Sequence, residues 1–264
     1  MDPYLQAYQC LEKGEPRRAI RQGRSVAAKD PVRWRSELNL SGLLIDAGSD
    51  LGSARLVREG VGRLSDVLSL IPSTSQATAH YNLGNGFLSL GQRERGKSPG
   101  TRPSLSFAIS HLAGSLAQEP RPNARVNLAY ALTEQGRYVE ALDELNEVIT
   151  QDPTHHSAYA GRARALWFSF MHLSGHPGLL QSAYLDYERA IETSSGSPVF
   201  QRSYQRSLAR LQKQVRTPVF RATSASAREL GMAAGTCTQP VSLLPRTDTQ
   251  CIRRLSPQGA PGSS

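Results

Sequence analysis

The sequence has few aromatic residues, few cysteines and no long apolar run. Aromatic residues make up 6% of its 264 residues, and the mean hydropathy is −0.41. Because no run of about 18 apolar residues is present, we expect no membrane-spanning helix. The N-terminus lacks a basic start and an apolar segment, so we expect no secretory signal. Cys10, Cys237 and Cys251 fit neither a disulfide framework nor a zinc spacing, which favours a reducing, cytoplasmic location.

Acidic residues are scarce towards the C-terminal end. Residues 1–197 hold 21 basic and 20 acidic side chains, whereas residues 198–264 hold ten basic and two acidic ones. Nearly all of the net charge of +9 therefore lies in the last quarter of the chain. From residue 216 the composition is rich in Ser, Thr, Pro and Gly and shows no sustained periodicity, so we predict a disordered basic tail over 216–264.

Two fixed spacings recur along the first two hundred residues. In five places a small residue precedes a helix-ending residue by 12 positions, and upstream of four of these a small residue precedes a glycine by seven. These spacings predict helical hairpins, in which the small residue permits close helix contact, the glycine closes the first helix with a positive φ, and a proline ends the second. The pairs are Ala19–Pro31, Gly60–Pro72, Ala108–Pro120, Ala141–Pro153 and Ala183–Ser195, with Ala7–Gly14, Ser41–Gly48, Gly84–Gly91 and Ala129–Gly136 upstream.

Two segments carry this pattern most completely: NARVNLAYALTEQGRYVEALDELNEVITQDP, residues 123–153, and HYNLGNGFLSLG, residues 80–91. In them the sequence resembles the tetratricopeptide repeat (TPR) family. The resemblance implies an all-α fold, a right-handed superhelical solenoid of about five hairpins with a C-terminal capping helix and a disordered tail. We expect insertions near 49–58, 93–104 and 171–182 to form surface turns. The expected repeats are 1–33, 34–75, 77–121, 122–155 and 156–197, followed by a cap over 198–215.

The sequence offers little support for catalysis. GQRERGKS, residues 91–98, matches a phosphate-binding pattern, but a repeat helix precedes it and Pro99 follows it, so we expect no nucleotide there. His172 and His176 are four apart, yet Gly175 and Pro177 break the helix that would align them on a metal. No nucleophile–base set is recognisable. We therefore predict a non-enzymatic protein without a metal or cofactor.

The first helices of such repeats line a concave groove, where this family usually binds peptide segments or helices. An asparagine stands two residues before the small residue of the three central first helices, and a row of side-chain amides can pair with the backbone of an extended peptide. The alternatives are that these asparagines support neighbouring helices and that the aromatics pack between helices. The candidate groove residues are Asn39, Asn82, Asn85, Asn127, Tyr81, Tyr130, Glu134, Arg164 and Trp167.

The predicted capping helix has one apolar and one basic face. Arg202, Arg206, Arg210 and Lys213 lie on the basic face. We therefore predict a scaffold or adaptor for a protein partner, and as an alternative function the binding of nucleic acid or another anionic surface through these cations and the tail. A third interpretation is that the basic face is simply solvated.

Overall fold

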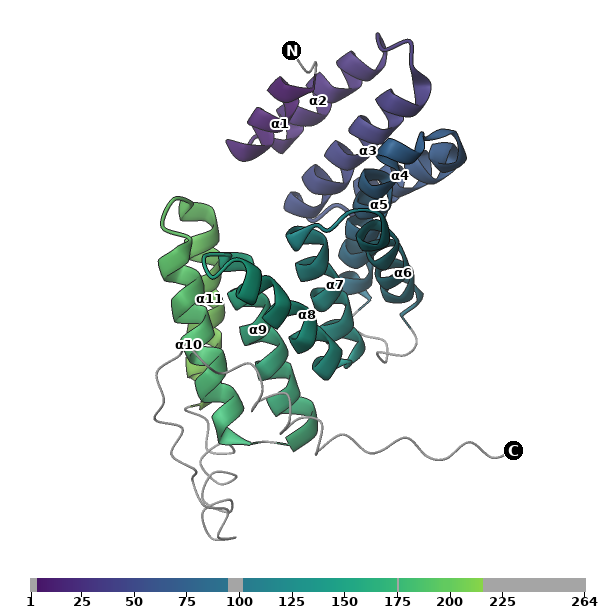
Figure 1. Cartoon of the computed structure of the whole chain (residues 1–264). Helices are drawn as coiled ribbons and strands as arrows, with labels where there is room; N and C mark the ends of the chain where they lie inside the picture. Colours follow the sequence, from purple (N-terminus) through teal and green to yellow (C-terminus); the bar gives the residue numbers. More distant parts are fainter. Residues whose placement is uncertain (1–3, 95–101, 175, 216–264) are drawn as a thin grey trace, which may run out of the picture. The chain divides into compact units, whose positions relative to one another are not determined.

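The computed structural model describes residues 4–94, 102–174 and 176–215, and regular structure in these ranges is helical (Figure 1). The all-α prediction is therefore confirmed, and the TPR resemblance is supported by helices that pair along the chain. The predicted tail over 216–264 lies outside the described residues. Lys97 and Ser98 of the phosphate-binding pattern also lie outside them. The helices are α1 (Leu5–Glu12), α2 (Pro16–Ala27), α3 (Arg33–Asp50), α4 (Ala54–Val67), η1 (Leu68–Leu70), α5 (Ser73–Arg93), α6 (Pro103–Gln118), α7 (Pro122–Gln135), α8 (Tyr138–Gln151), α9 (His156–Ser169), η3 (Phe170–Ser174), α10 (Pro177–Thr193) and α11 (Pro198–Val215).

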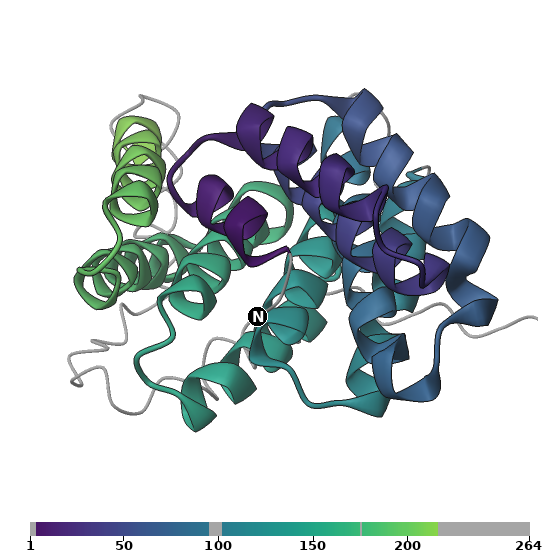
Figure 2. The same cartoon turned by 90° about the horizontal axis from the view of Figure 1, so that it is seen from above.

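The chain divides into two compact units, Met1–Gln135 (unit 1) and Gly136–Ser264 (unit 2). In unit 1 each helix from α1 to α7 packs against the next, and the alternate helices α1, α3, α5 and α7 also contact one another in turn. Figure 2 shows this packing from above. A first helix of one pair therefore lies beside the first helix of the next, which gives these helices a shared face.

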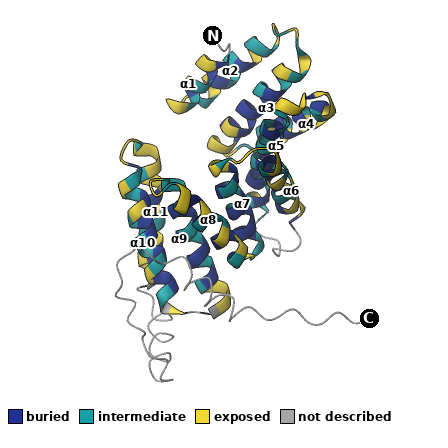
Figure 3. Ribbon diagram, in the orientation of Figure 1, coloured by how far each residue is buried: buried dark blue, intermediate teal, exposed yellow. Residues whose placement is uncertain are grey.

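Buried residues of unit 1 lie on the sides of the helices that face neighbouring helices (Figure 3), and most of them are apolar. One cluster joins α3, α4 and α5, and Trp34 and Phe87 pack against it. Its buried members are Leu38, Ile45, Val57, Val61, Leu64, Val67, Ile71, Ala79 and Leu83. Burial of this apolar stripe against the next helix is the main source of stability for a stacked hairpin.

Glycines set the closest helix contacts in unit 1. A Cβ atom at Gly84 would lie 2.5 Å from Leu112 Cγ, and one at Gly60 would lie 2.8 Å from the backbone oxygen of Ser41. The prediction that small residues permit close approach of the paired helices is thus explained at atomic level, because a larger side chain at position 60 would collide with backbone.

The predicted role of Gly48 and Gly91 as turn residues is wrong. Positive φ occurs at Gly14, Gly52 and Gly136, whereas Gly48 and Gly91 lie inside α3 and α5. Both are buried, and a Cβ at Gly91 would meet Leu105 Cγ at 2.8 Å. The insertions lengthen the first helices, so the turn of α3 moves to Gly52 and the earlier glycine becomes a packing position.

Two of the three insertions also differ from the expected surface turns, and most of the third, near 93–104, lies outside the described residues. Near 49–58, α3 continues to Asp50 and α4 begins at Ala54, so the extra residues are largely helical. Near 171–182, the first helix passes into the π-helical turn η3, and His172 of η3 stacks on Tyr138 of α8 at a ring-centroid distance of 6.4 Å. Backbone hydrogen bonding inside a helix satisfies the inserted residues better than an open loop does.

Unit 2 is held together by polar contacts as well as apolar ones. Arg162 of α9 donates from Nε and Nη2 to the two carboxylate oxygens of Asp186 in α10, each at 2.7 Å, and from Nη1 to Asn146 Oδ1 in α8 at 2.9 Å. Both side chains of the ion pair are largely buried. One guanidinium therefore joins three helices.

None of the helices in the described ranges is both long and apolar enough to cross a bilayer.

Candidate functional site

Polar side chains from α1, α3 and α5 meet on the face that these first helices share. A Cβ atom at Gly42 of α3 would lie 2.8 Å from the amide nitrogen of Asn82 in α5 and 3.2 Å from the hydroxyl of Tyr8 in α1. Tyr8 also donates its hydroxyl to the backbone oxygen of Asn39 at 3.4 Å. The missing side chain of Gly42 therefore leaves room for the Asn82 amide to lie across α3.

Two further amides, on α5 and α7, extend this group of polar side chains onto α7. Asn127 donates from Nδ2 to Asn85 Oδ1 at 2.7 Å. This bond uses one of the donors and one of the acceptor positions in the pair, so the rest of both amides can bind a ligand. We call Tyr8, Asn39, Asn82, Asn85 and Asn127 the asparagine face; all five side chains are half-buried.

The structure supports the helix-support interpretation for two of the asparagines and leaves ligand binding as a prediction. Asn85 and Asn127 support neighbouring helices, as the alternative interpretation predicts, because their bond links α5 to α7. The same bond fixes the orientation of the two amides. A fixed, partly exposed amide loses little conformational entropy when it binds, so helix support and ligand binding are compatible.

Glu134 does not lie on an open surface, contrary to the prediction. Its side chain is 3% exposed and accepts a hydrogen bond from Arg102 Nη1 at 3.1 Å. Arg102 precedes α6 and is itself buried. A buried carboxylate needs such a partner, so Glu134 fastens the start of α6 to α7 instead of facing a ligand.

The two candidate tyrosines of unit 1 are half-buried. Tyr130 packs beside Phe87 and Ile109 on a cluster that contains Leu88 and Leu105, as the packing alternative predicts. Tyr81 precedes Asn82 on α5 and keeps partial exposure. Of the two, Tyr81 is the better candidate for contact with a ligand.

Arg164 and Trp167 belong to α9 of unit 2, where Arg164 contacts a ring of its own helix and Trp167 contacts α11. Trp167 donates from Nε1 to Gln214 Oε1 of α11 at 2.6 Å, and the Arg164 guanidinium lies 5.2 Å from the centre of the Phe168 ring. His156 of α9 shares a hydrogen bond with the Tyr204 hydroxyl at 2.8 Å. Trp167 therefore helps to hold α11 in place.

Asp46 of α3 is a titratable side chain that the sequence analysis did not single out. It lies one helical turn beyond Gly42 on α3 and is exposed to solvent, although protein atoms crowd around it. This desolvation, and then the charge of Asp50, raise the pKa of Asp46 to about 6. The spacing from Asn39 to Gly42 to Asp46 was the available signal, since residues three and four apart share a helix face.

The phosphate-binding pattern and the pair of histidines considered for a metal both lie near the ends of first helices. Gly91 is a buried packing residue within α5, which is a helix and not the strand that a phosphate-binding loop follows. In the part of the chain that the structure describes, no group of three or more His, Cys, Asp or Glu side chains is placed to hold a metal ion.

The predicted anion-binding residues lie on α11. Arg202, Arg206, Arg210 and Lys213 are all exposed. Tyr204 and Leu211, on another side of the same helix, are buried. The helix is therefore amphipathic as predicted, with its basic residues towards solvent.

No protein-family model matches the sequence, and no curated protein matches it. Among solved structures, the chain is similar to MamA, with 21% identity over 72% of this chain and 95% of that one and a TM-score of 0.47. MamA from Desulfovibrio magneticus is 16% identical over 75% of this chain and 98% of that one, with a TM-score of 0.48. The nearly identical TPR-like repeats of a kinesin-light-chain-like protein from Podosopora anserina are 18% identical over 74% of this chain and 95% of that one, with a TM-score of 0.48. Identities this low leave function to be inferred from the residues of this chain.

Proposed function

We propose that the protein is a non-catalytic scaffold that binds an extended peptide segment of a partner protein on the asparagine face of unit 1. The observation that carries this proposal is the pair of amides on α5 and α7, Asn85 and Asn127, which are locked by a 2.7 Å hydrogen bond and remain half-exposed. Asn82 extends the row to α3, where Gly42 leaves room for its amide.

An extended backbone suits this row better than a helical one. Each side-chain amide can donate to a peptide carbonyl and accept from a peptide N–H, and these groups are accessible along an extended chain but are paired within a helix. Neighbouring helices pack about 8–10 Å apart, and a strand advances about 3.3 Å per residue. A segment of about six to nine residues would therefore cross α3, α5 and α7.

Binding through amides recognises backbone and not side-chain sequence. Tyr81 beside the row, and Asp46 one turn along α3, are the residues that would add side-chain preference. Tyr81 offers aromatic contact area at low entropy cost, and Asp46 offers a carboxylate to a basic side chain.

The test is a selection of nine-residue peptides from a displayed random library against the full chain, followed by affinity measurements on the Asn82→Ala/Asn127→Ala double variant. Two lost hydrogen bonds, at about 1 kcal/mol each, predict affinity weaker by about tenfold or more. Helical content and melting temperature should change little. Binding equal to that of the unmodified protein would show that the asparagine face is not the site.

A matched control is the Gln9→Ala/Gln118→Ala double variant. It removes two exposed amides from α1 and α6 outside the row. Its affinity for the selected peptides should equal that of the unmodified protein, and an equal loss in both variants would point to a general effect of amide removal.

A further inference from the structure

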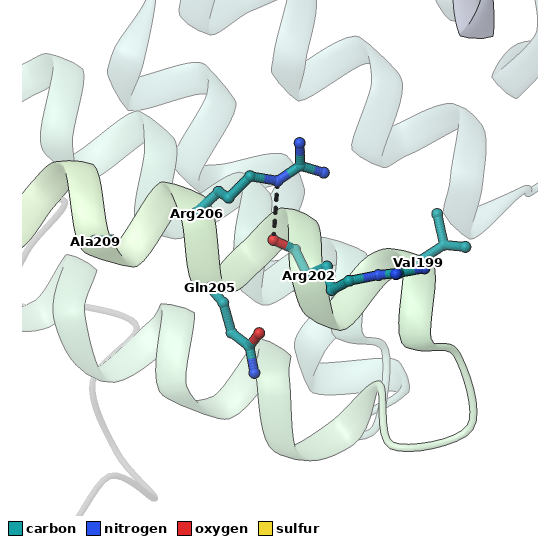
Figure 4. Close-up of a pocket in the computed structure, with 5 residues that line it drawn as sticks. All are labelled: Val199, Arg202, Gln205, Arg206 and Ala209. Carbon is teal, nitrogen blue, oxygen red and sulfur yellow. Dashed lines mark hydrogen bonds between the residues drawn. The ribbon is translucent and has the colours of Figure 1, made fainter.

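The solvent side of α11 carries a straight stripe of exposed residues. Val199, Arg202, Arg206, Ala209 and Lys213 follow one another at spacings of three and four, which places them along one line of a helix. With Gln205, the first four line a shallow pocket (Figure 4). Val199 is 61% exposed, so its side chain is available for apolar contact with a ligand.

Within residues 4–94, 102–174 and 176–215, the cations of α11 have no carboxylate partners. Elsewhere, arginines such as Arg63 and Arg162 pair with an acidic side chain of a neighbouring helix. The α11 sequence contains no acidic residue, and none of its four cations contacts a carboxylate of the described residues. The charge on this surface is therefore left for a ligand to neutralise.

Two of the arginines are held in place by their own helix. Arg202 donates from Nε to the backbone oxygen of Pro198 at 3.2 Å, and Arg206 donates from Nε to the backbone oxygen of Arg202 at 3.2 Å. Figure 4 shows the second of these bonds beside the pocket. Because the Nε groups are used, the terminal nitrogens of each guanidinium remain to bind an anion.

The helix itself is anchored on its other side. Tyr204 and Leu211 are buried, and Gln214 accepts a hydrogen bond from Trp167. The stripe is thus presented by a helix that is fixed at several points along its length. A surface held in this way loses little entropy on binding.

We propose that the stripe on α11 docks an acidic segment of a partner protein, with an apolar side chain next to its carboxylates. Carboxylates would pair with the terminal nitrogens of Arg202 and Arg206, and the apolar side chain would cover Val199 and the short side chain of Ala209. A nucleic-acid backbone would use the cations but has no need for the aliphatic residues between and beside them. The combination of an exposed valine with unpaired arginines therefore favours a protein ligand.

The experiment uses the full chain and a fluorescent peptide of about 18 residues, long enough to form a helix, built from Glu, Ala and a line of Leu. The Arg202→Ala/Arg206→Ala variant should bind it about tenfold or more weakly, since two charge-assisted contacts are lost. Val199→Ser should weaken binding about threefold or more through lost apolar contact. Replacing the Leu of the peptide by Ser should have a similar effect.

The matched control is Arg55→Ala/Arg58→Ala, which removes the same charge from exposed positions of α4. Its affinity for the peptide should stay unchanged. The proposal is overturned if the peptide does not bind, if the control loses as much affinity as the Arg202→Ala/Arg206→Ala variant, or if Val199→Ser has no effect. A duplex DNA that binds more tightly than the peptide, with equal affinity for the Val199→Ser variant, would also overturn it and assign the stripe to nucleic acid.

Discussion

The most buried contacts between paired helices discussed above are of a different kind in each unit. In unit 1, α3–α4 and α5–α6 approach through Gly60 and Gly84, which leave no side chain between the helices. In unit 2, α9–α10 are joined by the buried ion pair of Arg162 and Asp186, which also reaches Asn146 of α8. The two helices of a hairpin can thus be brought into contact either by a glycine, which has no side chain, or by a pair of oppositely charged side chains.

The difference predicts unequal sensitivity to substitution. A glycine contact is lost by adding atoms, and the cost depends on whether the neighbour can move. A buried ion pair is lost by removing atoms, and the cost is that of the charge left behind. We therefore expect the loss of the buried ion pair to lower the free energy of unfolding by the larger amount.

The largest expected effect is that of Asp186→Ala in unit 2. This change leaves the buried Arg162 guanidinium without its carboxylate, and we expect a loss of about 3–5 kcal/mol in the free energy of unfolding. Chemical denaturation of the full chain, monitored by circular dichroism, measures it. Arg189→Ala breaks the exposed pair with Glu192 and should cost less than about 1 kcal/mol. Equal losses would mean that burial does not distinguish the two pairs.

Gly60→Ala in unit 1 is expected to cost about 1–3 kcal/mol, because its Cβ would collide with the backbone oxygen of Ser41. Gly62 lies in the same helix, and a Cβ there would meet nothing within 4 Å. Gly62→Ala should therefore stabilise the protein, by about 0.5–1 kcal/mol, through helix propensity alone. Thermal and denaturant unfolding of the two variants provide the comparison, and a shift of the same sign in both would contradict close packing at Gly60.

A histidine pair adds a pH-dependent contact to unit 1. His80 and His111 face each other at 3.0 Å between their Nδ1 atoms, and burial, followed by the charge of His80, lowers the pKa of His111. The unfolded chain therefore binds a proton at this histidine more readily than the folded protein does. The free energy of unfolding should fall as pH drops below 6.5, the ordinary pKa of histidine. Denaturation midpoints at several pH values should show this loss, and His111→Gln should reduce it. In His176→Gln, a change at an exposed histidine, the loss should persist.

Asp46 of unit 1 contrasts with Asp186, because it gains no arginine partner and stays exposed. Its pKa of about 6 exceeds the ordinary value of 3.8, so the folded state binds the proton more readily and stability should fall as pH rises through this window. Asp46→Asn should therefore raise the unfolding midpoint slightly near neutral pH and have less effect at about pH 4. A lower midpoint near neutral pH would show that the carboxylate is stabilised by a contact.

Much of the fold could be predicted from the sequence, because local spacing controls it. The spacings Ala7–Gly14 and Ala129–Gly136 end in turns with positive φ, as predicted for a residue without a Cβ. Gly48 and Gly91 show the same spacing but lie within α3 and α5, which extend to Asp50 and Arg93. The spacing alone could not reveal where an insertion would be accommodated.

The candidate site was less predictable than the fold. The asparagines could be placed on one face from their position within each repeat, but the bond between Asn85 and Asn127 depends on how α5 meets α7. Glu134 has the spacing of a groove residue and is nevertheless buried against Arg102, which is 32 positions away. A helix face is a local property, whereas the partner of a charged side chain depends on the neighbouring helix.

The sequence by itself determined that this chain forms paired helices, because periodic apolar positions, small residues and helix-ending prolines act over a few turns. Tertiary structure alone decided which glycines turn the chain and which pack, which carboxylates are buried, and which cations of α11 contact no carboxylate of the described residues. The physical reason is range: helix formation and termination depend on residues within about four positions, while burial and ion pairing depend on atoms brought together from distant parts of the chain.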